Sequence, residues 1–150
     1  MKVECHWNEK MKFTAQSGDH TVVMDAKSPL GSDSGPSPKS LVLVGLAGCT
    51  GMDVIALLRK YKQTVTAMEI EADAPTTETH PQVFQKVDLI YRVAGSMEPQ
   101  KLIEAVHLSM SKYCGVSAMV AQAAPISYQI QLNGSEIHRG HADFAELEKS

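Results

Sequence analysis

The sequence has few of the features that mark several common functional classes. Lys and Arg number 14 against 17 Asp and Glu, which gives a formal net charge of −3, and the chain has no polybasic stretch. Nucleic-acid-binding domains usually carry a basic face, and membrane-surface segments carry clustered cations. We therefore expect neither nucleic acid nor a membrane as a partner. The chain also has neither a glycine-rich phosphate loop after a strand nor the nucleophile-elbow motif of many serine hydrolases.

Cysteine is scarce, with only Cys5, Cys49 and Cys114. An odd count does not suit a structural disulfide framework. Residues 1–7 alternate polar and apolar side chains, unlike the apolar core of a signal peptide. We expect a cytoplasmic protein, in which thiols stay reduced and any disulfide is transient or redox-active.

The sequence has one long hydrophobic run, from Leu41 to Leu58. Asp53 interrupts this run after about 12 apolar or small residues, fewer than the roughly 20 that a bilayer-spanning helix needs. The run therefore favours a buried helix of a soluble protein. Ser37 is a good N-cap and Pro38 a good first helical residue, and we expect the helix to end at Lys60 or Lys62.

At 150 residues the chain fits a single domain, residues 1–150, with a less certain polar tail over 134–150. Alternating side chains predict antiparallel strands, and apolar residues at helical spacing predict further helices. The pattern predicts an α+β fold in the order βββ-α-ββ-α-α-β. The strands are expected within 2–26 (three strands), 65–74, 87–93 and 126–132, and the further helices at 98–111 and 116–123.

Cys49 lies in the hydrophobic run with glycines on either side. Gly45, Gly48 and Gly51 recur every three residues, and each costs roughly 1 kcal/mol relative to alanine inside a helix. The three glycines would form a ridge along one side of the helix. Their cost indicates that another element packs closely against this glycine ridge. The ridge fits a tight helix–helix or dimer contact, or alternatively space for a substrate or partner thiol beside Cys49.

The other candidate groups lie elsewhere in the chain. Cys114 follows Lys112 and is expected at the start of a short helix, where free N–H groups and the helix dipole favour a thiolate; inert packing is the alternative. Cys5 is interpreted as a packing residue. His138 and His141 lie near Asp143, but in a segment expected to be loop and tail, so we expect no metal site and no cofactor.

Two segments together resemble a known family. Residues 37–54 (SPKSLVLVGLAGCTGMDV) are similar to the central-helix signature of the OsmC/Ohr family, the osmotically induced and organic-hydroperoxide-resistance proteins. Residues 106–116 (VHLSMSKYCGV) resemble its second-cysteine signature, and residues 80–84 fit its OsmC-like branch. The resemblance covers roughly residues 1–132.

The resemblance implies the OsmC-like fold as an intertwined homodimer, in which antiparallel sheets wrap around the long central helices. It also implies a cytoplasmic, stress-response peroxidase of the peroxiredoxin type. Cys49 matches the catalytic cysteine that attacks an organic hydroperoxide, and Cys114 the catalytic cysteine that resolves the sulfenic acid as a disulfide. A thiol or dithiol reductant would complete the cycle.

The sequence departs from the family pattern at two places. Lys39 stands where characterised peroxidases of the family carry a carboxylate, ten residues before the first cysteine. Their early-strand arginine is also absent, since no arginine precedes Arg59, and Lys10 or Lys12 is the available substitute. Two other functions fit the same scaffold: a dimer that binds a small hydrophobic ligand without peroxidase activity, and a thiol redox sensor.

Overall fold

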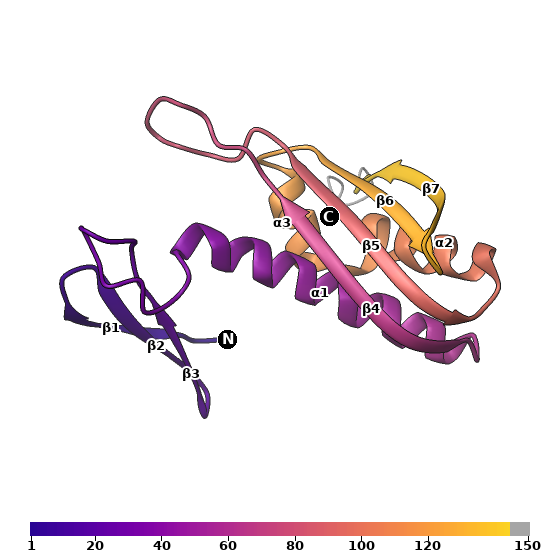
Figure 1. The fold of residues 1–150 in the computed structure, drawn as a ribbon, viewed down its shortest axis with the longest axis horizontal. Helices are drawn as coiled ribbons and strands as arrows, with labels where there is room; N and C mark the ends of the chain where they lie inside the picture. Colours follow the sequence, from indigo (N-terminus) through magenta and orange to yellow (C-terminus); the bar gives the residue numbers. More distant parts are fainter. Residues whose placement is uncertain (145–150) are drawn as a thin grey trace. The chain divides into compact units, whose positions relative to one another are not determined.

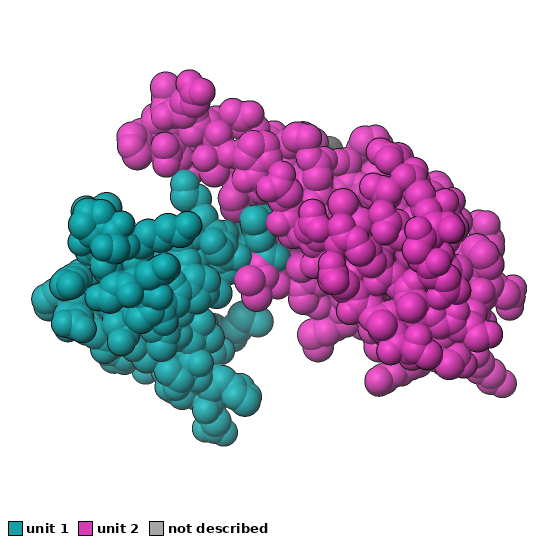
Figure 2. Space-filling view, viewed as in Figure 1, with its two compact units in different colours: residues 1–43 teal, residues 44–150 magenta. Residues whose placement is uncertain are grey.

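The computed structural model describes residues 1–144, and the last residues of the expected polar tail, 145–150, lie outside the described part. The chain divides into two compact units, residues 1–43 and 44–150, which Figure 2 colours separately. The expectation of one domain over 1–150 stays a prediction. The α+β fold class is confirmed by two β-sheets and a long helix (Figure 1).

The first unit contains an antiparallel sheet in the order β1-β2-β3. Its strands are β1 (Glu4–Glu9), β2 (Lys12–Ser17) and β3 (His20–Met24), as the sequence predicted. The apolar side chains of this sheet are largely exposed in the chain, and Trp7 retains 64% of its accessible surface. Cys5 is also exposed, so its interpretation as a packing residue is wrong for this chain. A three-stranded sheet in so short a segment has too little chain to bury its own faces.

Asp25 organises the loop that follows β3. Its carboxylate accepts hydrogen bonds from the backbone N–H groups of Ala26, Ser32 and Ser34 and from the Ser34 hydroxyl, at 2.8–3.2 Å. A Cβ on Gly31 would lie only 2.2 Å from the Ala26 carbonyl oxygen, which explains glycine at that position. One buried carboxylate therefore holds the loop together.

The long helix α1 (Pro38–Lys60) begins and ends as predicted. The Ser37 hydroxyl accepts a hydrogen bond from the N–H of Ser40, which is the N-cap arrangement. Leu46, Thr50, Val54 and Leu58 recur every fourth residue and are fully buried. Burial of each leucine contributes about 1.5–3 kcal/mol. By length and composition α1 could also span a membrane; in this chain one face of the helix is buried.

The second unit contains a four-stranded sheet in the order β4-β5-β6-β7. Alternate residues of β5 and β6 are buried, as the period-two pattern predicted. The expectation of purely antiparallel strands is wrong at one pair, because β5 runs parallel to β6. The helical crossover between these two strands allows this direction. The strands are β4 (Thr64–Asp73), β5 (Val87–Ser96), β6 (Ile126–Leu132) and β7 (Ser135–His141).

Two elements differ from the sequence predictions in this unit. The segment from Gly134, expected as tail, forms β7 beside β6. The helix expected over 98–111 is α2 (Pro99–Leu108), followed by a π-helical turn, η1 (Ser109–Tyr113). The short helix α3 (Gly115–Ala121) then leads back to the sheet. A single π turn depends on local tertiary packing, so the spacing of apolar residues in the sequence does not predict it.

Candidate functional site

The α1 helix presents Cys49 and Asp53 on one face. Residues four apart in a helix lie one above the other, so the thiol and the carboxylate become neighbours through local geometry alone. Both side chains are half-buried. In the sequence pattern, Asp53 stood out only as a break in the hydrophobic run. Its spacing from Cys49 was the signal that could have identified it.

The π turn places the second half of the site. The Cys114 N–H donates to the Ser109 carbonyl oxygen at 3.1 Å, five residues back, which closes the wide turn of η1. Cys114 is then the N-cap of α3, and its Sγ accepts a hydrogen bond from the Ser117 N–H at 3.3 Å. The expected position at a helix start is confirmed.

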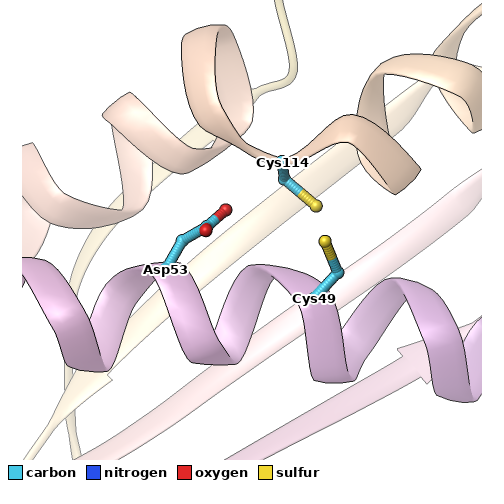
Figure 3. Close-up of side chains that lie close together, drawn as sticks. All are labelled: Cys49, Asp53 and Cys114. Atoms are coloured by element: carbon cyan, nitrogen blue, oxygen red, sulfur yellow. The ribbon is translucent and has the colours of Figure 1, made fainter.

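The structure brings Cys49, Asp53 and Cys114 together, although the cysteines are 65 residues apart in the sequence. The two sulfurs and a carboxylate oxygen of Asp53 all lie within 4.8 Å of one another. Figure 3 shows the three side chains pointing toward a common centre, two from α1 and Cys114 from the opposite segment. Cys114 is buried while Cys49 is partly accessible, so solvent and solutes reach Cys49 more readily.

A chain of buried hydroxyls connects the sheet to Asp53. Ser109 donates to Asp53 Oδ2 at 3.0 Å. Its single proton is thereby used, so at the 2.9 Å contact between Thr50 and Ser109 the Thr50 hydroxyl donates. Tyr91 must then donate to Thr50 at 2.6 Å. Every hydroxyl in the row Tyr91, Thr50, Ser109 therefore donates toward the carboxylate and fixes its orientation.

The surroundings of these groups oppose ionisation of Cys114. Burial raises the pKa of the Cys114 thiol above its ordinary value; hydrogen bonds from Ser117 lower it, and the nearby Cys49 raises it again. The expectation that the helix start would favour a thiolate at Cys114 is therefore wrong, because burial outweighs the helix N–H groups. Burial also raises the pKa of Tyr91, so this hydroxyl keeps the proton that it donates to Thr50.

The remaining predicted residues lie outside this cluster. Lys10 lies in the turn between β1 and β2, Lys12 begins β2, and Lys39 is an exposed residue in the first turn of α1. His138 and His141 are both on β7, and three residues apart in a strand place them on opposite faces. Among residues 1–144, the only cluster of three metal-ligating groups is that of Cys49, Asp53 and Cys114.

The glycine ridge of α1 borders an open apolar groove. A Cβ added at Gly45 or Gly48 would meet no atom of residues 1–144 within 4 Å, whereas at Gly51 it would lie 3.0 Å from Ile70. Within this chain, only Gly51 therefore has the close neighbour that the glycine spacing predicted. The groove between α1 and β4 is lined by Val44, Ala47, Gly48, Gly51, Met52, Ile55, Met68 and Ile70.

Comparisons with known proteins agree with this architecture. Residues 31–129 match the family described as OsmC-like protein. Protein YhfA of Escherichia coli is 31% identical over 134 residues, covering 88% of this chain and 98% of its own length. An OsmC-like protein of Mycoplasma pneumoniae has a similar structure, with a TM-score of 0.77 at 15% identity over 87% of this chain and 95% of its own.

An organic hydroperoxide resistance protein from Elizabethkingia anophelis shares the fold, with a TM-score of 0.64. It is 17% identical, and the match covers 89% of this chain and 97% of the other. The family match spans well over half of the chain, and the alignment to YhfA covers nearly all of that relative. The chain therefore belongs to the OsmC-like family.

Proposed function

We propose that this protein is a thiol-dependent peroxidase that reduces organic hydroperoxides, with Cys49 as the attacking thiol and Cys114 as the resolving thiol. The observation that carries the proposal is the approach of the two sulfurs to within 4.8 Å across the site. Cys49 is partly accessible and Cys114 is buried, so a substrate would meet Cys49 first. The fold shared with an organic hydroperoxide resistance protein supports the substrate class.

The reaction has three steps. The Cys49 thiolate attacks the terminal peroxide oxygen, which forms a sulfenic acid and releases an alkoxide that takes up a proton to become the alcohol. The Cys114 sulfur then attacks the Cys49 sulfenic sulfur, which forms the disulfide and releases water. Two thiol groups of an external reductant finally reduce the disulfide, restore both cysteines and become a disulfide themselves.

Exposure and protonation support this division of roles. Cys49 is partly accessible, as a group that meets a substrate must be, and Cys114 is buried. The raised pKa of Cys114 keeps it a thiol, with burial as the main cause. A resolving cysteine has to become a thiolate only in the second step, and protonation protects it from direct oxidation.

The apolar surfaces of the chain support a homodimer as the working form. Val44 and Met52 on α1 retain 61% and 76% of their accessible surface, and they line the groove beside the unfilled glycine positions. The sheet of the first unit also leaves Trp7 exposed. Exposed apolar surface on each unit marks an interaction site, and a second copy would cover it. The cytoplasm supplies the thiol reductants that this cycle consumes.

The decisive experiment is a stoichiometric oxidation. Reduced protein receives one equivalent of cumene hydroperoxide, free thiols are alkylated, and peptides are identified by mass spectrometry. We expect a Cys49–Cys114 disulfide and loss of one equivalent of peroxide. The Cys5→Ser variant is the matched control, since Cys5 is exposed and outside the cluster, and it should behave like the parent. Absence of both the disulfide and peroxide loss would overturn the proposal.

The apolar groove also supports the alternative of a binding protein for a small hydrophobic ligand. Its lining residues are all apolar or glycine, and a small hydrophobic ligand could occupy it within a dimer. This alternative predicts a dimer that retains a ligand through purification and does not consume peroxide. Native mass spectrometry of the untreated protein distinguishes a dimer with a retained ligand from a dimer without one.

A further inference from the structure

We propose that Cys49, Cys114 and Asp53 form a divalent-metal site that binds Zn²⁺ when both thiols are reduced, with a fourth position open to water. Two thiolates and one carboxylate are a donor set that zinc accepts. Three protein ligands with one open position are the usual arrangement of accessible zinc sites.

The distances suit a tetrahedral ion. With Zn–S bonds near 2.3 Å and Zn–O bonds near 2.1 Å, tetrahedral ligand atoms lie roughly 3.6–3.8 Å apart. The sulfur and carboxylate atoms here lie within 4.8 Å of one another. Closing the site therefore requires movements of about 1 Å or less, which small rotations of the cysteine side chains supply. Figure 3 shows the three groups converging on one point.

A hydrogen bond holds the Asp53 carboxylate in place. Asp53 Oδ2 accepts it from the Ser109 hydroxyl, and a carboxylate oxygen of Asp53 lies within 4.8 Å of both sulfurs. The hydroxyls of Thr50 and Tyr91 continue this support into the core. Hydrogen-bonded partners behind the ligands are what hold metal sites in place. Cys114 has comparable support from the Ser117 N–H.

The local charge also favours a cation. Among residues 1–144 no lysine, arginine or histidine makes an ion pair with Asp53. Binding releases one proton from each thiol, and the two thiolates with the carboxylate carry three negative charges. A divalent ion reduces the net charge of the site from −3 to −1. The half-buried setting makes such neutralisation more valuable than it is in water.

We expect metal binding and oxidation of the two cysteines to exclude each other. Sulfurs coordinated to zinc are unavailable to a peroxide, and formation of the disulfide removes two of the three ligands and releases the ion. This consequence rests on the proposed peroxidase function, whereas metal binding does not.

Cobalt titration tests the binding. Co²⁺ is added without oxygen to the reduced, metal-free protein, and absorption is recorded. We expect one equivalent per chain, with thiolate-to-cobalt charge-transfer bands that Zn²⁺ abolishes. Cys49→Ser and Cys114→Ser should each lose about half of this absorption or all binding, because each thiolate supplies one bond. Asp53→Asn should weaken binding about tenfold or more. Cys5→Ser is the control and should match the parent.

The outcomes separate this inference from the peroxidase proposal. No charge-transfer band in the parent, or bands retained when Cys49 and Cys114 are both replaced, overturns the metal site. If a cysteine variant does not fold, Asp53→Asn decides alone, since unchanged affinity also overturns it. The peroxide assay uses metal-free protein, so either proposal can fail without the other. Zinc-saturated protein should form the disulfide at least about tenfold more slowly, because its sulfurs are coordinated.

Discussion

The Ser109 hydroxyl donates a 3.0 Å hydrogen bond to Asp53 Oδ2 across 56 residues of sequence. This contact joins the π turn to the central helix beside the two cysteines. Because Ser109 receives its own hydrogen bond from Thr50, which receives one from Tyr91, the carboxylate is held from within the core. Removal of one hydroxyl in this row should therefore affect stability as well as the site.

Tyr91→Phe removes the hydroxyl at the buried end of the row. Thr50 then loses its donor in a fully buried position. We expect the free energy of unfolding to fall by about 1–3 kcal/mol, measured by urea denaturation. Tyr128→Phe is the matched control, because the Tyr128 hydroxyl makes no hydrogen bond with a described residue, and it should change stability by about 0.5 kcal/mol or less. Equal losses in both variants would contradict the hydroxyl row.

Cys114→Ser tests the order of the two cysteines. Without the resolving thiol, the oxidised intermediate should persist as a Cys49 sulfenic acid, and consumption should stop after one equivalent of peroxide when no external thiol is added. Trapping with dimedone followed by peptide mass spectrometry measures this product. Cys49→Ser should form no adduct and consume no peroxide. An adduct on Cys114 in the Cys49→Ser variant would reverse the proposed roles.

The three thiols should react with iodoacetamide at different rates near neutral pH. Cys5 is exposed, whereas Cys114 is buried and its pKa is raised, mainly by burial. Since the thiolate is the reactive form, we expect Cys5 to be alkylated first and Cys114 to be the slowest, by about tenfold or more relative to Cys5. Time-resolved peptide mass spectrometry gives the three rates. Rapid labelling of Cys114 in the folded protein would contradict its burial.

Acid should weaken the first unit through Asp25. Burial by itself raises the pKa of this carboxyl, but hydrogen bonds from Ser34, Ala26 and Ser32 outweigh burial and lower it from 3.8 to about 2. The folded state then binds fewer protons than the unfolded state. The stabilisation is complete above about pH 4 and is lost as the pH falls toward 2.

Amide hydrogen exchange of the loop over residues 26–35, corrected for intrinsic pH dependence, measures this loss. Asp25→Asn removes the titrating group and is the matched control. In that variant the protection of the loop should be lower at neutral pH and should no longer fall between pH 4 and 2. A parent protein whose loop protection is constant over this range would contradict the role of Asp25.

Gly48→Ala tests whether a second copy covers α1. In an isolated chain the added methyl group meets no atom within 4 Å, and alanine should stabilise the helix by about 1 kcal/mol. If two helices pack across the glycines, the same methyl group should weaken the dimer. We expect a higher dissociation constant by sedimentation equilibrium. An unchanged association with a gain in stability would contradict packing at this ridge.

Local sequence patterns were enough to locate most elements. Ser37 and Pro38 marked the start of α1, and alternating apolar and polar side chains marked β5. These features depend on residues a few positions apart, where backbone geometry alone decides which side chains share a face. The strand β7 and the π turn were missed, because polar edge strands and π turns leave weak local signals.

The sequence alone determined the central helix and the adjacency of Cys49 to Asp53, which follows from a spacing of four residues. The approach of Cys114 and the hydroxyl row from Tyr91 were decided by the tertiary structure. Contacts across 41 to 65 residues depend on how α1, η1 and the sheet pack. No local periodicity encodes that packing, so the cluster of Cys49, Asp53 and Cys114 forms only when the chain is folded.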